Sequence, residues 1–170
     1  MSRVFRREGS TINKKLALAL PMTVLALFLV YQLYTNDLYT DNPPYDSSLL
    51  NGPYAVERVV DGDTFIAWVE GDRTRVRMTG IDTPESVADN PDRITEEGLI
   101  AADYTEQLLT GSEVYLEYDK EKWDKYDRLL AYVYIKDGKE FIFINKLLID
   151  EGYAVGYIYK PNTRYADILK

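Results

Sequence analysis

The sequence predicts an α+β domain, mainly β, built as a five-stranded Greek-key barrel of the OB type with two to three packed helices. Three observations predict it. Three strand-like segments follow one another closely, a capped helix comes next, and two more strand-like segments follow that helix. Five strands with a helix inserted after the third are typical of small OB barrels, whose loops at one rim bind oligonucleotides.

The predicted strands are recognised by alternation of apolar and polar residues and by β-branched and aromatic residues. The clearest example is RTRVRMT, in which charged and apolar side chains alternate as in a half-exposed strand. A turn at Gly71-Asp72 separates the second and third strands, which gives a three-stranded meander. The strands are expected at residues 54–60, 63–70, 73–79, 112–119 and 128–136.

The first helix is predicted from its end signals. Thr95 is a good N-cap, two glutamates occupy the first turn, and Gly111 follows the last apolar residue near position 109. A second helix is expected over residues 142–151, closed by Gly152, and a third is expected to begin near Tyr165.

The N-terminus predicts a membrane anchor. Residues 16–34 are 19 residues without a charge, and at about 1.5 Å per residue a helix of that length spans roughly 28 Å, close to the thickness of a bilayer core. Basic residues precede this segment and none follows closely, which places the N-terminus in the cytoplasm and the domain outside the cell. A cleaved signal peptide, leaving a secreted protein, is the alternative. The predicted organisation is therefore a basic tail at 1–15, the anchor at 16–34, a linker at 35–52 and the domain at 53–170.

The composition restricts the possible chemistry. The chain has no cysteine and no histidine, which excludes disulfides, thiolate metal sites and every mechanism that uses a histidine base. The chain carries −8 and residues 1–35 carry +4, so residues 36–170 carry −12. Such an acidic domain does not attract polyanions as a whole, so nucleic-acid binding would require a local basic pocket or a metal ion.

Three motifs carry candidate chemistry: Asp61-Gly62-Asp63-Thr64 in a turn, Arg77 followed by Asp82-Thr83-Pro84-Glu85, and Asp124-Lys125-Tyr126-Asp127-Arg128 at the start of a strand. Without histidine, phosphodiester hydrolysis would use a hard cation held by aspartate oxygens, a carboxylate as base, and guanidinium groups on the phosphate. Each motif alone is most often a structural turn or a solvated loop, and only their combination indicates a site.

The order DGDT, R-x4-DTPE, DKYxR and YxYKPN resembles the staphylococcal nuclease family over about residues 53–168. This resemblance implies an OB barrel, calcium as cofactor, DNA or RNA as substrate, and products that carry 3′-phosphates. It also implies that the Lys160–Pro161 bond is often cis. No protein partner is predicted.

Transferred by position, the resemblance implies a role for each matching residue. Arg77 and Arg128 correspond to the phosphate-binding arginines and Glu85 to the general base. Asp63, Asp82 and the Thr83 carbonyl correspond to the calcium ligands, and Asp61 to a carboxylate behind them. The residues expected to contact substrate are Lys125, Tyr126, Tyr157 and Tyr159.

Three features depart from the family pattern. Asp127 stands where glycine is frequent, and its carboxylate is expected to compete for Arg128. The domain is acidic, and the chain stops at Lys170, where a third helix is expected to continue. Two alternatives to an active nuclease therefore stay open: a catalytically impaired module that binds nucleic acid or protein, and a membrane-tethered interaction domain without a nucleic-acid role.

Overall fold

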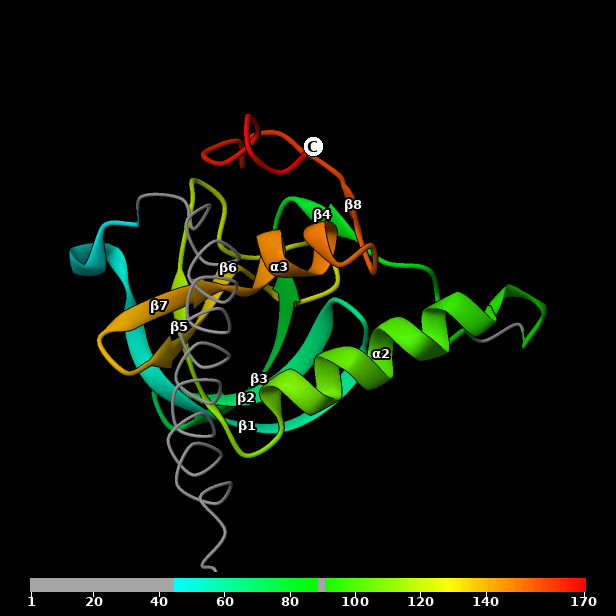
Figure 1. Ribbon diagram of the computed structural model, residues 1–170. Helices are drawn as coiled ribbons and strands as arrows, with labels where there is room; N and C mark the ends of the chain where they lie inside the picture. The colour runs from blue at the N-terminus through cyan, green and yellow to red at the C-terminus, as the bar shows by residue number, and fades with distance from the viewer. Residues whose placement is uncertain (1–44, 89–90) are drawn as a thin grey trace, which may run out of the picture. The chain divides into compact units, whose positions relative to one another are not determined.

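A computed structural model describes residues 45–88 and 91–170, and these form a mainly β domain with two α-helices (Figure 1). The predicted anchor at 16–34 and most of the predicted linker lie outside the described residues. In the part of the chain that is described, no helix combines the length and the apolar character needed to cross a membrane. The elements are η1 (Ser47–Leu49), β1 (Asn51–Asp61), β2 (Thr64–Val69), β3 (Asp72–Met78), β4 (Ile81–Asp82), η2 (Pro91–Arg93), α2 (Glu96–Leu109), β5 (Glu113–Glu117), β6 (Leu129–Asp137), β7 (Glu140–Phe143), α3 (Ile144–Asp150) and β8 (Val155–Gly156).

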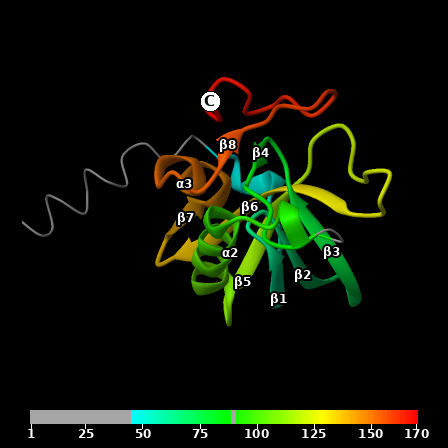
Figure 2. The ribbon, with the colours of Figure 1, turned by 90° about the vertical axis from the view of Figure 1, so that its right-hand side faces the viewer.

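Five strands close into a barrel. The sheet order is β3-β2-β1-β5-β6-β7, and parallel pairing of β3 with β6 joins the two ends of the five-stranded part. Strands β1, β2, β3, β5 and β6 thus make the closed barrel, with α2 inserted between the third and fourth of them (Figures 1 and 2). The predicted OB architecture is confirmed.

The alternation in the strands decides which side chains fill the barrel. Phe65, Ala67 and Val69 of β2 point inward, as does Val76 of β3, and all four belong to one core cluster with apolar residues of β5, β6 and α3. Burial of this apolar surface is the main stabilising contribution to the fold.

Helix α2 lies against β1, as Figure 1 shows. Its buried residues are Gly98, Ala101, Thr105 and Leu109, whose spacing of three and four places them on one face. The predicted cap is confirmed, since the Gly98 N–H donates to Thr95 Oγ1 at 3.0 Å.

The predictions for the second and third helices need correction. Residues 140–143 form β7, which pairs with β6, so α3 begins at Ile144 and not at 142. No helix begins near Tyr165. The chain makes a series of turns there, because Leu169 folds back into the core and its side chain lies against Gly80.

Candidate functional site

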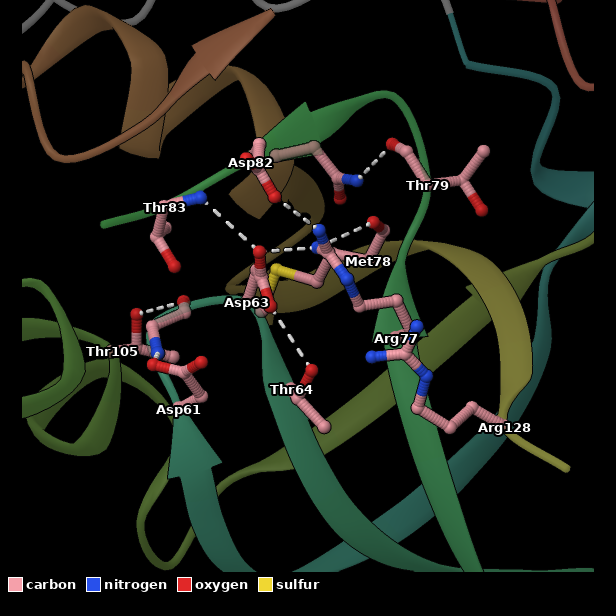
Figure 3. A network of polar contacts seen from close by, with 12 residues as sticks. Asp61, Asp63, Thr64, Arg77, Met78, Thr79, Asp82, Thr83, Thr105 and Arg128 are labelled. Carbon is pink, nitrogen blue, oxygen red and sulfur yellow. Dashed lines mark hydrogen bonds and ion pairs between the residues drawn. The ribbon is translucent and has the colours of Figure 1, made fainter. Parts of the chain in front are cut away.

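The turn between β1 and β2 is fastened to the loop after β4. Asp61 Oδ1 accepts hydrogen bonds from Ser86 Oγ at 2.6 Å and from the Ser86 N–H at 3.2 Å. Gly62 lies so close to Thr83 that an added Cβ would be 2.7 Å from Thr83 Oγ1. From the other side, Thr105 Oγ1 of α2 donates to the Gly62 carbonyl at 2.7 Å. The DGDT and DTPE motifs therefore meet at one place, where Asp63 and Thr83, 20 residues apart, are hydrogen-bonded (Figure 3).

Asp63 is the buried centre of this region, with 4 % of its surface exposed. Its carboxylate accepts from Thr64 Oγ1 at 3.0 Å and from the Thr83 N–H at 3.2 Å, and it forms an ion pair with Arg77. Burial raises the pKa of Asp63 to about 6, and the Asp61 charge adds to this, although Arg77 and the Thr83 N–H act in the opposite direction. A positive charge near Asp63 therefore stabilises its ionised form.

Arg77 joins two of the predicted carboxylates, because its guanidinium pairs with Asp63 and its Nη2 lies 2.7 Å from Asp82 Oδ1 (Figure 3). Nη1 also donates to the Met78 carbonyl at 3.2 Å. Asp63 and Arg77 are largely buried, whereas the Asp82 side chain is 52 % exposed. One planar guanidinium thus holds a buried and an exposed carboxylate at the same rim of the barrel.

Glu85 lies beside this network and is not bonded to it. Within the described ranges its carboxylate is joined to Arg93, with Oε2 3.6 Å from Arg93 Nη2. Its backbone is hydrogen-bonded to the start of α2, where the Thr95 N–H donates to the Glu85 carbonyl at 3.0 Å. Gly98 also packs there, and an added Cβ would be 2.2 Å from the same carbonyl oxygen. The position of Glu85 is therefore set by the first turn of α2.

Arg128 forms an ion pair with Asp124, a residue to which the sequence analysis assigned no role. Its Nε lies 2.7 Å from Asp124 Oδ2, and Asp124 Oδ1 accepts from the N–H groups of Arg128 and Tyr126, each at 2.9 Å. Burial alone would raise the pKa of Asp124, but these hydrogen bonds and the Arg128 charge hold it below its usual value. Asp124 belongs to the DKYDR motif, so the sequence includes it in the site but does not predict that it pairs with Arg128.

A pocket of about 480 Å³ brings Arg77 and Arg128 together. It lies between the loop before β6 and the segment after β8, and an exposed tyrosine from each, Tyr126 and Tyr159, lines it. Its lining includes all the residues predicted to bind phosphate or substrate, namely Arg77, Lys125, Tyr126, Arg128, Tyr157 and Tyr159. Asp61, Asp63, Asp82, Thr83 and Glu85 are not part of the lining.

Asn162 is a further pocket residue that the sequence did not single out. It is 3 % exposed, accepts from the Glu121 N–H at 2.8 Å and donates to the Glu121 carbonyl at 2.8 Å. The two bonds fasten the segment that carries Tyr157 and Tyr159 to the loop that carries Arg128. The only sequence signal was its place in the YKPN motif.

The comparison with known proteins matches this arrangement. A family model described as staphylococcal nuclease homologue matches residues 75–170. The thermonuclease of Staphylococcus hyicus is 37 % identical over 161 residues, which cover 92 % of this chain and 90 % of that protein. The thermonuclease of Staphylococcus intermedius is 36 % identical over 159 residues, with the same two coverages. Endonuclease YncB of Bacillus subtilis is 40 % identical over 114 residues, which cover 66 % of this chain and 52 % of that protein.

The chain belongs to the staphylococcal nuclease family. This staphylococcal nuclease homologue has the cis Lys160–Pro161 bond that the resemblance implied. The expected competition of Asp127 for Arg128 is not found among the described residues, because the carboxylate that binds the guanidinium is that of Asp124. Asp127 itself has a φ of +61°, in the left-handed region that glycine adopts most readily. The backbone conformation explains the frequent glycine at this position.

Proposed function

We propose that this chain is a calcium-dependent nuclease that hydrolyses phosphodiester bonds of DNA or RNA and leaves 3′-phosphate products. The observation that carries the proposal is the pocket with Arg77 and Arg128 in its lining, next to the buried carboxylate of Asp63. The names of the relatives, thermonuclease and endonuclease, support the same reaction class.

The donor atoms near Arg77 fit a hard cation. Asp63 and Asp82 supply carboxylate oxygens that one guanidinium already brings together, and the Thr83 backbone lies beside Asp63. The Thr83 hydroxyl adds a buried oxygen for which the described residues provide no hydrogen-bond partner. Asp63, Asp82 and the Thr83 carbonyl would hold Ca²⁺, and Asp61 would keep the Thr83–Ser86 loop in place.

This cation site is expected to be weak. Only two of its proposed ligands, the side chains of Asp63 and Asp82, are carboxylates. Few charged ligands give calcium affinities toward the millimolar end of the range, which suits an extracellular protein. When bound, the ion would supply positive charge against the phosphate and favour ionisation of the attacking water.

The two arginines would neutralise the charge that develops on the phosphoryl oxygens. Arg77 would exchange its exposed partner Asp82 for phosphate and keep its buried partner Asp63. Arg128 would donate to phosphate through its Nη atoms while Asp124 holds its Nε. Orientation by these carboxylates favours arginine over lysine, because only a planar guanidinium serves two partners at once.

Glu85 would accept the proton of the water that attacks phosphorus. The P–O5′ bond would then break, the 5′-oxygen would leave and take up a proton from solvent to become a hydroxyl, and the phosphate would stay on the 3′ side. The ion pair between Glu85 and Arg93 is long and exposed, so it opposes this role little. Tyr157 and Tyr159 would stack on a base without reading its identity.

We also propose that residues 16–34 anchor the protein in the membrane with the domain outside the cell, or direct its secretion after cleavage. The support is the uncharged length of this segment and the basic residues before it.

The residue roles are tested by alanine substitution. Arg77→Ala, Glu85→Ala and Arg128→Ala should each lower kcat by roughly 10²–10³-fold or more, which is the effect of removing one preorganised stabilising group. Lys139→Ala, an exposed change in the β6–β7 turn, serves as the control. A variant that keeps near-full activity would remove that residue from the mechanism.

Asp63→Ala should mainly weaken calcium binding. A calcium titration with unchanged affinity would contradict that assignment.

One observation favours a second candidate, a catalytically impaired module that binds nucleic acid or protein. Both pocket arginines are already engaged by carboxylates, and Glu85 is not bonded to their network. A folded protein that binds oligonucleotide with calcium and never cleaves it would favour this candidate.

A further inference from the structure

The outward face of β2 and β3 carries cationic and aromatic side chains that continue from the pocket. Successive side chains of a strand point to opposite faces, and Val76 of β3 points into the core. Arg73 and Arg75 therefore share the outward face with Arg77. The core residues Ala67 and Val69 likewise place Trp68 of β2 on the outward face, where it is 48 % exposed.

The register brings these residues side by side. Trp68 pairs with Arg73, and Ile66 pairs with both Arg75 of β3 and Arg58 of β1. At about 3.4 Å per residue, Arg75 and Arg73 lie roughly 7 and 14 Å from Arg77 along β3. We define the strand track as Arg58, Trp68, Arg73 and Arg75. Three of these residues belong to β2 and β3, the strands on the side of the barrel away from β7 in Figure 2.

The charges of the track are only partly balanced. Arg73 forms a bidentate ion pair with Glu57, with distances of 2.8 Å from Nε to Oε2 and from Nη2 to Oε1. Arg58 and Arg75 are exposed, and neither forms an ion pair with any residue of the described part. Two exposed guanidiniums without an ion pair, Arg58 on β1 and Arg75 on β3, stand out in residues 36–170, whose net charge is −12.

We propose that the strand track binds the single-stranded nucleic acid that extends from the pocket. Arg58 and Arg75 contact phosphates, and Trp68 stacks on a base. The inference rests on the proposed nuclease function, because the occupant is identified by charge complementarity and by continuity of the track with Arg77. OB barrels bind oligonucleotides on the face of their second and third strands, and each contacts about 4–16 nucleotides, more than the pocket alone holds.

The test compares long and short ligands on the full-length protein in neutral detergent. Binding of a fluorescein-labelled 12-nucleotide oligo(dT) is measured by anisotropy with a calcium chelator present, so the result does not depend on hydrolysis. Trp68→Ala should weaken binding roughly fivefold to 150-fold, the range for loss of one base stack. Arg75→Ala should reduce the slope of log K against log salt by about 0.7, as expected for one phosphate contact on a single strand.

A variant expected to bind the 12-mer more tightly distinguishes a loss of direct contacts from general damage to the fold. Glu57→Gln removes the carboxylate that neutralises Arg73 and should tighten binding of the 12-mer. Lys139→Glu changes the net charge as Arg75→Glu does, at an exposed site outside the track, and should have a much smaller effect than Arg75→Glu. Hydrolysis of a nitrophenyl ester of thymidine 3′,5′-bisphosphate, which has no flanking nucleotides for the track to bind, should stay within twofold of wild type for all track variants.

Several results would overturn the proposal. In one, both Trp68→Ala and Arg75→Glu bind the 12-mer as tightly as wild type; in another, Lys139→Glu weakens binding of the 12-mer as much as Arg75→Glu does. In a third, the track variants lose as much activity on the small ester as they lose affinity for the 12-mer. In the last, binding of anionic vesicles depends on Arg75 and binding of the 12-mer does not. If the wild type binds the 12-mer through the track but never cleaves it, the proposed nuclease function fails and the track stands.

Discussion

Gly98→Ala should damage catalysis through the backbone of Glu85. An added Cβ at position 98 would lie 2.2 Å from the Glu85 carbonyl oxygen, 2.5 Å from its carbon and 2.9 Å from the Pro84 carbonyl oxygen, whereas ordinary contact begins at 3.4 Å. These neighbours are backbone atoms, so no side chain can rotate away. The loop that carries Glu85 must move by about 1.2 Å to restore ordinary contact.

A displacement of this size has a calculable consequence. A 1 Å misplacement of a catalytic group costs about 100-fold in rate, so kcat should fall by roughly that factor, while KM changes little because Arg77 and Arg128 are untouched. The stability effects oppose each other: alanine in a helix gains about 1 kcal/mol over glycine, and the overpacking costs about 1–3 kcal/mol. The net loss of about 1 kcal/mol leaves the protein folded.

The assay is steady-state hydrolysis of single-stranded DNA with calcium, together with urea unfolding of each variant. Leu99→Ala, the exposed neighbour on the same helix, is the matched control and should keep wild-type kcat. Wild-type kcat in Gly98→Ala would refute the reasoning. So would a loss confined to KM, because the contact would then not set the position of the base.

Three stability predictions follow from other contacts, each checked by urea unfolding. Asp127→Gly should raise the free energy of unfolding by about 0.5–1 kcal/mol, because residue 127 has a φ of +61°; a less stable variant would contradict the strain assigned to it. Arg164→Ala should cost about 2–3 kcal/mol, since it leaves the fully buried carboxylate of Glu117 without its ion-pair partner, while Lys170→Ala, which breaks an exposed pair, should cost less than about 0.5 kcal/mol. Thr105→Val should cost about 2 kcal/mol because it leaves the Gly62 carbonyl without its 2.7 Å hydrogen bond; stability equal to wild type would show that water or another donor replaces the hydroxyl.

The strands and the first helix could be predicted because their signals are local. Alternation along RTRVRMT is enough to place β3, and the Thr95 cap with Gly111 bounds α2. Strand β7 was missed because EFIF runs directly into the helix INKLLID, and the N-cap residue Phe143 makes no capping hydrogen bond that would mark the boundary. Strands β4 and β8 are two residues each and arise only from a long-range pairing.

In the site, too, the sequence predicts the residue types, whereas the contacts between them depend on the fold. The residue types and their order predict a group around Asp63, Arg77 and Arg128, and the fold does place the two arginines in one pocket. The partners that orient them depend on three-dimensional contacts. Asn162 reaches Glu121 across 41 residues, and Gly98 acts on Glu85 only because α2 packs there.

The measurement that tests the central claim most directly is hydrolysis of single-stranded DNA by the purified full-length protein, with calcium and then with a chelator. We predict cleavage with calcium, none with the chelator, and products that carry 3′-phosphate ends. Cleavage that persists with the chelator, or a protein shown to be folded that cleaves in neither condition, would contradict the account.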